Sequence, residues 1–253
     1  MYTMFFIVFV NLVGFGIVIP LLPFYAEHYD ASPDQVTLVM AVYSPAQFAT
    51  APIWGRLSDR FGRRPILIVS LAGTLVAYLW LAFAANLTDL FLARTAAGLM
   101  AGSISAAFAY VADVTDETNR AKGMGLIGAA FGLGFIAGPA IGGILAGADL
   151  ATTNFQLPAY AAAAFSGAAL IMTLAILKES LSGEARQRMA SQSRDAHRQA
   201  FRRTVNAKSV RVMIILTFLA VFVFAGLEAT FAMWTERKFG WGVLQNGYVF
   251  AFL

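Results

Sequence analysis

The sequence predicts an all-α membrane protein with seven complete spans and the start of an eighth. Three observations support this fold class. Of the 253 residues, 59% are hydrophobic and only 13% are charged, whereas soluble domains carry about 25% charged residues. Apolar runs long enough to cross a bilayer as helices recur along the chain. The loops between these runs alternate between acidic and basic.

The apolar runs have about 20 residues or more, which at 1.5 Å per residue crosses roughly 30 Å of hydrocarbon. In order, they lie near residues 4–26, 35–54, 65–85, 90–112, 123–148, 155–177 and 212–234. No Lys or Arg precedes the first run, so we expect an uncleaved first span and not a signal peptide. An eighth run has only begun at Leu253, so we expect the sequence to be incomplete.

The loops predict how the spans are oriented. Loops 27–34, 86–89 and 149–154 carry acidic residues and no Lys or Arg, whereas segments 55–64, 113–122 and 178–211 carry 15 of the 18 Lys and Arg residues. Because basic loops remain in the cytoplasm, we predict a cytoplasmic N-terminus. Arg237 and Lys238, after the seventh run, fall on the outer side against this rule.

The same features divide the chain into three predicted parts. Residues 1–177 form a six-span N-terminal bundle, and residues 178–211 form a cytoplasmic linker rich in Arg, Gln and Ser. Residues 212–253 begin a C-terminal bundle with span seven and the start of span eight. We expect part of the linker to be an amphipathic helix on the membrane surface.

The second and third runs are joined by a strongly cationic stretch. Because lipid cannot satisfy charge or irregular backbone, we expect a short turn in water or headgroups. Gly55 and Gly62 permit turn dihedrals, and Pro65 suits the first turn of the next helix. The stretch reads Gly55-Arg56-Leu57-Ser58-Asp59-Arg60-Phe61-Gly62-Arg63-Arg64-Pro65.

The order G-x-L-x-D-R-x-G-R-R closely resembles the loop between spans two and three of the major facilitator superfamily. A simple membrane-surface anchor is the alternative interpretation. The resemblance implies that Asp59 latches the two halves of the protein on the cytoplasmic face. Its implied partners are Arg60, Arg63 and Arg64, with Arg120 of the next inner loop as a further candidate.

This resemblance implies the major facilitator fold, in which two related six-span halves make a twelve-span transporter. The chain would then contain the N-terminal six-helix bundle, one complete span of the second half and the start of another. The resemblance also implies a protein that is a monomer when full length, embedded in the lipid bilayer of a bacterial inner membrane.

The fifth run contains a ladder of glycines. Gly134, Gly138 and Gly142 are four residues apart and share one helix face, where small residues let another backbone approach closely. Pro139 bends the helix. Helix packing alone is one interpretation. The whole pattern, however, resembles the antiporter motif of drug/proton exporters in this superfamily, which favours export by exchange: Gly125, Gly134, Gly138, Pro139, Gly142 and Gly143.

Two ionisable residues fall inside predicted spans, where charge is costly and usually functional. Arg94 either reaches the outer headgroups or faces a polar interior, and Arg94–Gly98 resembles the span-four motif in which the family's arginine takes part in proton transfer. Ala97 stands where a Gln is common. Glu228, at a similar depth in span seven, is either a structural, hydrogen-bonded group or the proton carrier. Because a guanidinium stays charged, we expect Glu228 to bind the proton and Arg94 to tune it.

Within the first run, the stretch from Asn11 to Pro23 resembles the first span of the tetracycline exporters. The likeness extends through the first six spans. Asn11 and Ala77 stand where those exporters place Asp, which puts tetracycline itself, carried as a metal chelate, in doubt. We expect Asn11, Gln47 and Ser103 to line the substrate cavity. The alternative is that these polar side chains bond neighbouring helices.

Taken together, the resemblance implies proton-coupled export of a small amphipathic, drug-like compound by alternating access. The alternatives are an uptake facilitator for a metabolite and a truncated half-transporter without activity. The expected partners are the small-molecule substrate, protons and lipid. The basic residues sit in separate short loops, which argues against nucleic acid. We expect neither an enzyme, because H-E-x-x-H and G-x-S-x-G are absent, nor any cofactor or metal.

Overall fold

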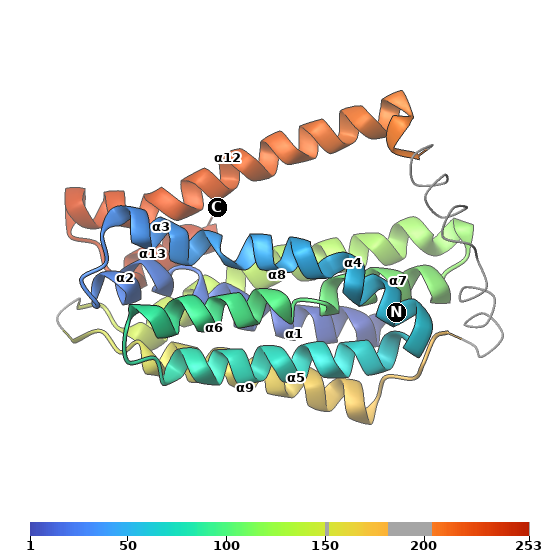
Figure 1. Cartoon of the computed structure of the whole chain (residues 1–253), viewed down its shortest axis with the longest axis horizontal. Helices are drawn as coiled ribbons and strands as arrows, with labels where there is room; N and C mark the ends of the chain where they lie inside the picture. Colours follow the sequence, from blue (N-terminus) through green and yellow to red (C-terminus); the bar gives the residue numbers. More distant parts are fainter. Residues whose placement is uncertain (150–151, 182–203, 253) are drawn as a thin grey trace.

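The structure is a computed structural model that describes residues 1–149, 152–181 and 204–252. The regular structure of this described part is entirely helical, and its long helices run side by side (Figure 1). The helices are α1 Tyr2–Val18, α2 Leu21–Glu27, α3 Pro33–Ala41, α4 Tyr43–Phe61, α5 Arg63–Ala82, α6 Leu87–Leu99, α7 Ser103–Val114, α8 Glu117–Ala146, α9 Gln156–Ala175, α12 Lys208–Phe239 and α13 Val243–Phe252.

Seven segments of the described chain are long and apolar enough to cross a membrane. They confirm the predicted all-α membrane fold class. Most extend beyond the predicted apolar runs, because a helix continues into its polar flanks once it leaves the hydrocarbon. The segments are Tyr2–Glu27, Pro33–Phe61, Arg63–Ala82, Leu87–Val114, Glu117–Ala146, Gln156–Ala175 and Lys208–Phe239.

Helices α1 to α9 form one bundle with α1 near its centre. The packing of α1 is most extensive against α8 and α9, and α5 packs against α9. Two clusters of buried side chains fill the interior, one around Ile17 and Tyr25 and the other around Leu12 and Leu67. We call the end of the bundle that contains Gly62 and Glu179 the linker end, and the opposite end, which contains Glu27, the far end.

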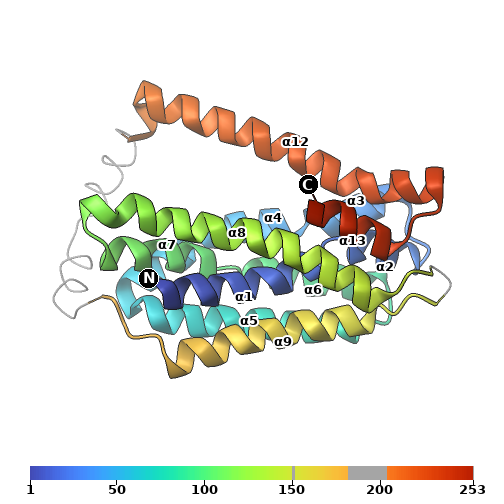
Figure 2. The ribbon, with the colours of Figure 1, turned by 180° about the vertical axis from the view of Figure 1, so that it is seen from behind.

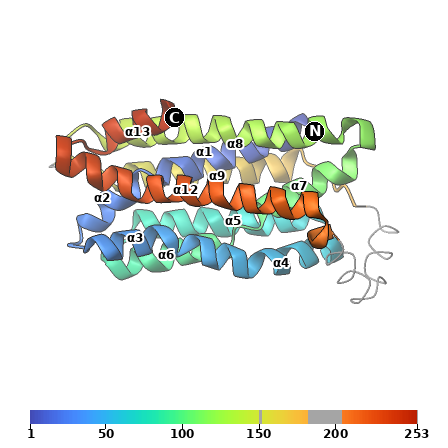
Figure 3. The ribbon, with the colours of Figure 1, turned by 90° about the horizontal axis from the view of Figure 1, so that it is seen from above.

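The most extensive contacts of helix α12 are near the far end, with α2 and α3 of the bundle and with α13. Toward the linker end it diverges from the bundle, as two opposite views show (Figures 1 and 2). Seen from above, α12 lies over the middle of the bundle and runs nearly along the direction of the other long helices (Figure 3). Its apolar side chains from Val212 to Phe224 are exposed in the described chain. An apolar surface of this size requires lipid or further protein.

Three spans that were predicted as continuous helices are interrupted. Span one changes from α1 to α2 at Ile19 and Pro20, because proline has no N–H to continue the hydrogen-bond ladder. Span two is divided at Val42, and span four is divided into α6 and α7 by residues 100–102.

The predicted cationic turn at 55–64 was wrong in extent. Helix α4 continues to Phe61 and α5 begins at Arg63, so Gly55 is helical and Gly62 alone, at φ 108° and ψ 164°, forms the turn. Arginine favours helix, and these residues lie beyond the apolar run, so water can solvate them in a helix. Residues 182–203 of the predicted linker lie outside the described residues, and α12 already begins at Lys208.

Candidate functional site

The linker end contains a cluster of charged side chains centred on Arg63. This residue is only 3% exposed. Its Nε donates to Oδ2 of Asp113 at 2.9 Å, and its Nη1 donates to Ser58 Oγ at 3.1 Å and to Oδ1 of Asp59. One guanidinium therefore ties α4, α5 and α7 together. A planar guanidinium is suited to joining three helices, because its N–H groups point in fixed directions and can bond two carboxylates at once.

Glu179, which sequence reasoning missed, completes this cluster. Its carboxylate oxygens accept the backbone N–H groups of Arg63 and Arg64 at 2.9 and 3.1 Å, at the first residues of α5. It also accepts the N–H groups of Ser180 and Leu181, both at 3.1 Å. A carboxylate here satisfies free N–H groups and faces the positive end of the helix. The available signal was an acidic residue directly after the sixth apolar run.

The other predicted gate residues are more dispersed. Arg64 donates from Nη2 to the carbonyl of Leu174 at 2.8 Å, and Arg60 lies over the ring of its neighbour Phe61. Arg120 lies in the first turns of α8. Within the described residues, the ion pair of Asp59 is with Arg63 and not with Arg120.

The glycine ladder lies directly against α1. A Cβ added to Gly138 would stand 2.6 Å from Cα of Gly16, and one added to Gly142 would stand 2.6 Å from the carbonyl oxygen of Ile17. Gly134 is equally close to Leu12, with Cβ to Cβ at 2.7 Å. These distances are too short for a side chain, so the spacing of α8 from α1 depends on glycine.

The two remaining glycines of the predicted motif behave differently from the ladder. Gly143 faces α13, where its Cβ would stand 3.0 Å from Cα of Leu244. Gly125 has open space around it. The motif therefore joins α8 to two partners, α1 and α13, and Gly125 takes no part in either contact.

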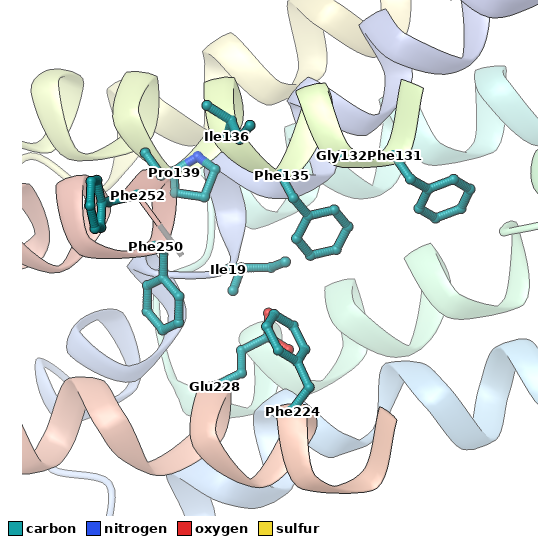
Figure 4. Close-up of a pocket in the computed structure, with 11 residues that line it drawn as sticks. Ile19, Phe131, Gly132, Phe135, Ile136, Pro139, Phe224, Glu228, Phe250 and Phe252 are labelled. Atoms are coloured by element: carbon teal, nitrogen blue, oxygen red, sulfur yellow. The ribbon is translucent and has the colours of Figure 1, made fainter. Parts of the chain in front are cut away.

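The main cavity lies between the bundle and the helices α12 and α13 and has a volume of about 380 Å³. Its walls are mostly phenyl rings and aliphatic groups, and Phe135, Phe224 and Phe250 extend toward the same space as the Glu228 side chain (Figure 4). Glu228 is the single ionisable residue among its described lining residues: Ile19, Phe131, Gly132, Phe135, Ile136, Pro139, Phe224, Glu228, Phe250, Ala251 and Phe252.

Arg94 does not reach the headgroups, because it is only 4% exposed and is enclosed by protein. Its guanidinium lies 4.7 Å from the ring centre of Tyr43 and 5.9 Å from that of Phe15. Within the part of the chain that the structure describes, its Nε and Nη1 have no hydrogen-bond partner. The ring of Phe15 packs edge-on against Phe135, which lines the main cavity.

Arg94 and Glu228 are groups of opposite charge. The described part of the chain nevertheless contains no ion pair between them. A buried guanidinium with unpartnered nitrogens and a carboxylate in an apolar cavity are both costly unless something neutralises or bonds them.

The predicted cavity residues Asn11 and Ser103 lie elsewhere. Both line a void of about 10 Å³ inside the bundle, beside Leu67, and Ser166 Oγ donates to Asn11 Oδ1 at 3.4 Å. Such a void holds roughly one water. Gln47, on α4, is not among the described residues that line the main cavity. The structure therefore brings none of the three to Glu228.

Known proteins similar to this chain include two bacterial resistance proteins. The chain is 34% identical over 244 residues to "Tetracycline resistance protein, class C" of Escherichia coli, which covers 93% of this chain and 58% of the relative. It is 32% identical over 238 residues to "Multidrug resistance protein 2" of Bacillus subtilis (strain 168), which covers 92% of this chain and 57% of the relative. The chain thus spans less than two thirds of these relatives.

Solved structures share the arrangement of helices. A human organic anion transporter superposes with a TM-score of 0.75 at 24% identity, over 99% of this chain and 68% of that one. A bacterial homolog of the human lysosomal transporter Spinster superposes with a TM-score of 0.76 at 15% identity, over 98% of this chain and 56% of that one. The family description "Major Facilitator Superfamily" matches residues 4–253. With its helices arranged as in these transporters, the chain belongs to the Major Facilitator Superfamily.

Proposed function

We propose that this chain is part of a secondary transporter that exports a small amphipathic compound in exchange for protons by alternating access. The observation that carries the proposal is the position of Glu228. It is the single acidic group in the described lining of an apolar cavity between the bundle and α12. The names of the similar resistance proteins support export as the direction of transport.

The chemistry of the cavity favours a substrate with an aromatic or aliphatic body. Phenyl rings bury large apolar surfaces and accept flat aromatic groups, and binding pockets of this kind use few polar groups for orientation. Glu228 is more compatible with these surroundings when it is protonated, because an isolated carboxylate is costly in an apolar site. A substrate that also carries a positive charge would instead favour the ionised carboxylate, so a cationic aromatic substrate and a proton can exclude one another at this residue.

Arg94 has a supporting role in this proposal. Its charge remains constant during transport, so it can lower the affinity of Glu228 for a proton when the two approach. In the present arrangement they are separated, because the described residues contain no ion pair between them. Phe15, which lies against Arg94, packs on Phe135 of the cavity wall. Rocking of α12 against the bundle would change this separation and with it the affinity for the proton.

The arrangement of α12 supports alternating access. It contacts the bundle at the far end and diverges at the linker end. We propose that the linker end and the N-terminus are cytoplasmic, as the basic segments indicate, in a bacterial inner membrane. Residues 1–177 would then be the N-terminal bundle, 178–211 the linker and 212–253 the start of the second bundle, in a protein that acts as a monomer.

The test measures efflux by the complete gene product in a bacterium that lacks its own drug exporters. We expect cells to accumulate less of a fluorescent aromatic cation such as ethidium, and a protonophore to abolish the difference. Glu228→Gln should abolish proton-driven efflux, whereas Glu117→Gln, at an exposed acid of α8, should not. Intact proton-driven efflux by Glu228→Gln would exclude Glu228 as the coupling group. Accumulation above the empty-vector level would indicate uptake instead.

A further inference from the structure

Span four is two helices joined by a short non-helical link (Figure 1). Helix α6 ends at Leu99, and α7 begins at Ser103. Between them the regular hydrogen-bond ladder is interrupted, because the N–H of Gly102 bonds the carbonyl of Met100 at 2.7 Å, two residues back. Regular helix resumes where the N–H of Ala106 donates to the carbonyl of Gly102. Among the described residues the carbonyl of Leu99 thereby loses its helical partner, whereas that of Met100, which accepts the N–H of Gly102, keeps a second lone pair for another donor.

Side chains from two other spans bond these carbonyls. The indole Nε1 of Trp54, on α4, donates to the carbonyl of Leu99 at 2.7 Å. The hydroxyl of Ser70, on α5, donates to the carbonyl of Met100 at 2.5 Å. Within a membrane, backbone groups that leave the helical ladder must find such partners in the protein. The two bonds therefore stabilise the interruption.

Three glycines allow the neighbouring helices to pack closely around the link. A Cβ on Gly102 would stand 2.5 Å from Cγ of Trp54, and one on Gly73 would stand 2.5 Å from Cγ of Met100. A Cβ on Gly98 would stand 2.4 Å from the backbone carbonyl oxygen of Tyr43. Larger residues at these three positions would push α4 or α5 away from the link.

The link separates two functional groups on the same span. Arg94 lies on α6 and stacks on Tyr43 of α4. Asp113 lies at the end of α7 and is bonded by Arg63 of the linker-end cluster. Trp54 belongs to the same helix as Tyr43, so α4 holds α6 both beside Arg94 and at the carbonyl of Leu99. Span four can thus bend between the half that carries Arg94 and the half held at the linker end.

We propose that Trp54 is a positioning residue for transport, which sets the orientation of the Arg94-bearing half of span four by bonding the carbonyl of Leu99. Ser70 fixes the other side of the same link, at Met100. The part of this inference that concerns transport rests on the proposed function, whereas the geometry of α6 relative to α7 does not.

The first experiment measures this geometry in the complete protein with pairs of spin labels. These 253 residues contain no cysteine, so each introduced pair is specific once any cysteine outside them has been replaced by serine. Cysteines at Leu92 and Val76 report the distance from α6 to α5, and cysteines at Val114 and Val69 report the distance from α7 to α5. All four positions are exposed.

We expect Trp54→Phe, which keeps a ring and removes the N–H donor, to shift or broaden the α6–α5 distance and to leave the α7–α5 distance unchanged. Ser70→Ala should affect the same pair. Trp80→Phe on the partly exposed face of α5 is the matched control and should affect neither. Unchanged distances in both labelled pairs of Trp54→Phe, or equal changes in both, would overturn the inference.

The second experiment measures proton-driven efflux as a function of pH. If Trp54 sets the position of Arg94, Trp54→Phe should lower the rate about fivefold, the effect of one lost hydrogen bond, and displace the pH profile, whereas Trp80→Phe should do neither. An unchanged rate and pH profile alongside altered label distances would overturn the role in transport. If the unaltered protein transports nothing, the proposed function fails, and the spin-label distances still decide whether Trp54 holds the link.

Discussion

At the residue scale, the buried guanidinium of Arg63 organises the charged cluster at the linker end. The sequence predicted the cationic stretch as a group of candidate gate residues, but not that Arg63 would be buried at the centre of a cluster. That outcome depends on α4 continuing to Phe61 and turning only at Gly62, which directs Arg63 inward toward Asp113. Glu179 could not be assigned from its own segment, because its partners are backbone groups of a distant helix.

Arg63 should therefore be the most sensitive residue of the cationic stretch. Arg63→Ala leaves the carboxylate of Asp113 largely buried, and breaking a buried ion pair costs about 3–5 kcal/mol. Arg60→Ala removes an exposed arginine stacked on Phe61 and should cost less than about 1 kcal/mol. Thermal unfolding in detergent measures both. Equal losses of stability would show that Arg63 is not the centre of the cluster.

Glu179 should stabilise the start of α5. Glu179→Ala removes an acceptor for the N–H groups of Arg63 and Arg64, and the loss of a helix cap costs about 0.5–2 kcal/mol. Glu117→Ala is the matched control, because Glu117 is also an acid in the first turn of a helix but is exposed. Hydrogen exchange should increase at the N-terminus of α5 in Glu179→Ala, and much less at the N-terminus of α8 in Glu117→Ala. An equal increase at the two helix ends would mean that burial of the carboxylate is unimportant.

At the scale of elements, the sequence predicted the spans and the glycine face of α8 but not what opposes that face. Spacing of four residues places Gly134, Gly138 and Gly142 together, whereas the identity of α1 as their partner depends on how the whole bundle packs. The interruptions of spans one and four were missed for different reasons. Pro20 lies inside an uninterrupted apolar run, and the link in span four contains no proline at all.

The glycine face should tolerate no side chain where it touches α1. In Gly138→Leu the new side chain meets backbone atoms of Gly16 and Val13, which no rotamer change can move, and overpacking costs roughly 1–3 kcal/mol. We expect this variant and Gly142→Leu to lose efflux and thermal stability. Gly125→Leu, on the same helix in open space, should retain both. Loss of efflux in Gly125→Leu with normal stability would assign that glycine a role outside packing.

At the scale of the whole molecule, the sequence predicted the order of spans and the family but not the angle of α12. Few contacts set this angle, and the most extensive of them, with α2, α3 and α13, lie near the far end. Among them, Nη2 of Arg237 lies 3.9 Å from Oε1 of Glu27, and Glu236 is also close to Glu27. Arg237 lies on the predicted outer side, where the positive-inside rule does not expect a basic residue. Its ion pair with Glu27 accounts for a basic side chain at this end.

This ion pair should favour closure of the far end without adding much stability. The side chains of Arg237 and Glu27 are 61% and 23% exposed, and pairs near the surface are worth about 0–1 kcal/mol. The pair joins α12 to α2, so it must separate when α12 moves away from the bundle at the far end. Arg237→Gln also leaves Glu27 and Glu236 to repel one another. A change of 1 kcal/mol corresponds to about a fivefold shift in a two-state equilibrium.

A single cysteine at Ala232 of α12, which is 1% exposed, can report this opening in the otherwise cysteine-free chain. We expect Arg237→Gln to increase its rate of alkylation by up to about fivefold. Glu27→Gln loses the same pair but also removes the repulsion from Glu236, so its increase should be smaller. The exchanged pair Glu27→Arg with Arg237→Glu should restore a slow rate, although Glu236 weakens the restoration by repelling the new glutamate. Lys238→Gln, beside Arg237, is the control and should leave the rate unchanged. Faster alkylation in the exchanged pair than in either single variant would contradict an attractive contact, because the exchange preserves the opposite charges and alters only their positions.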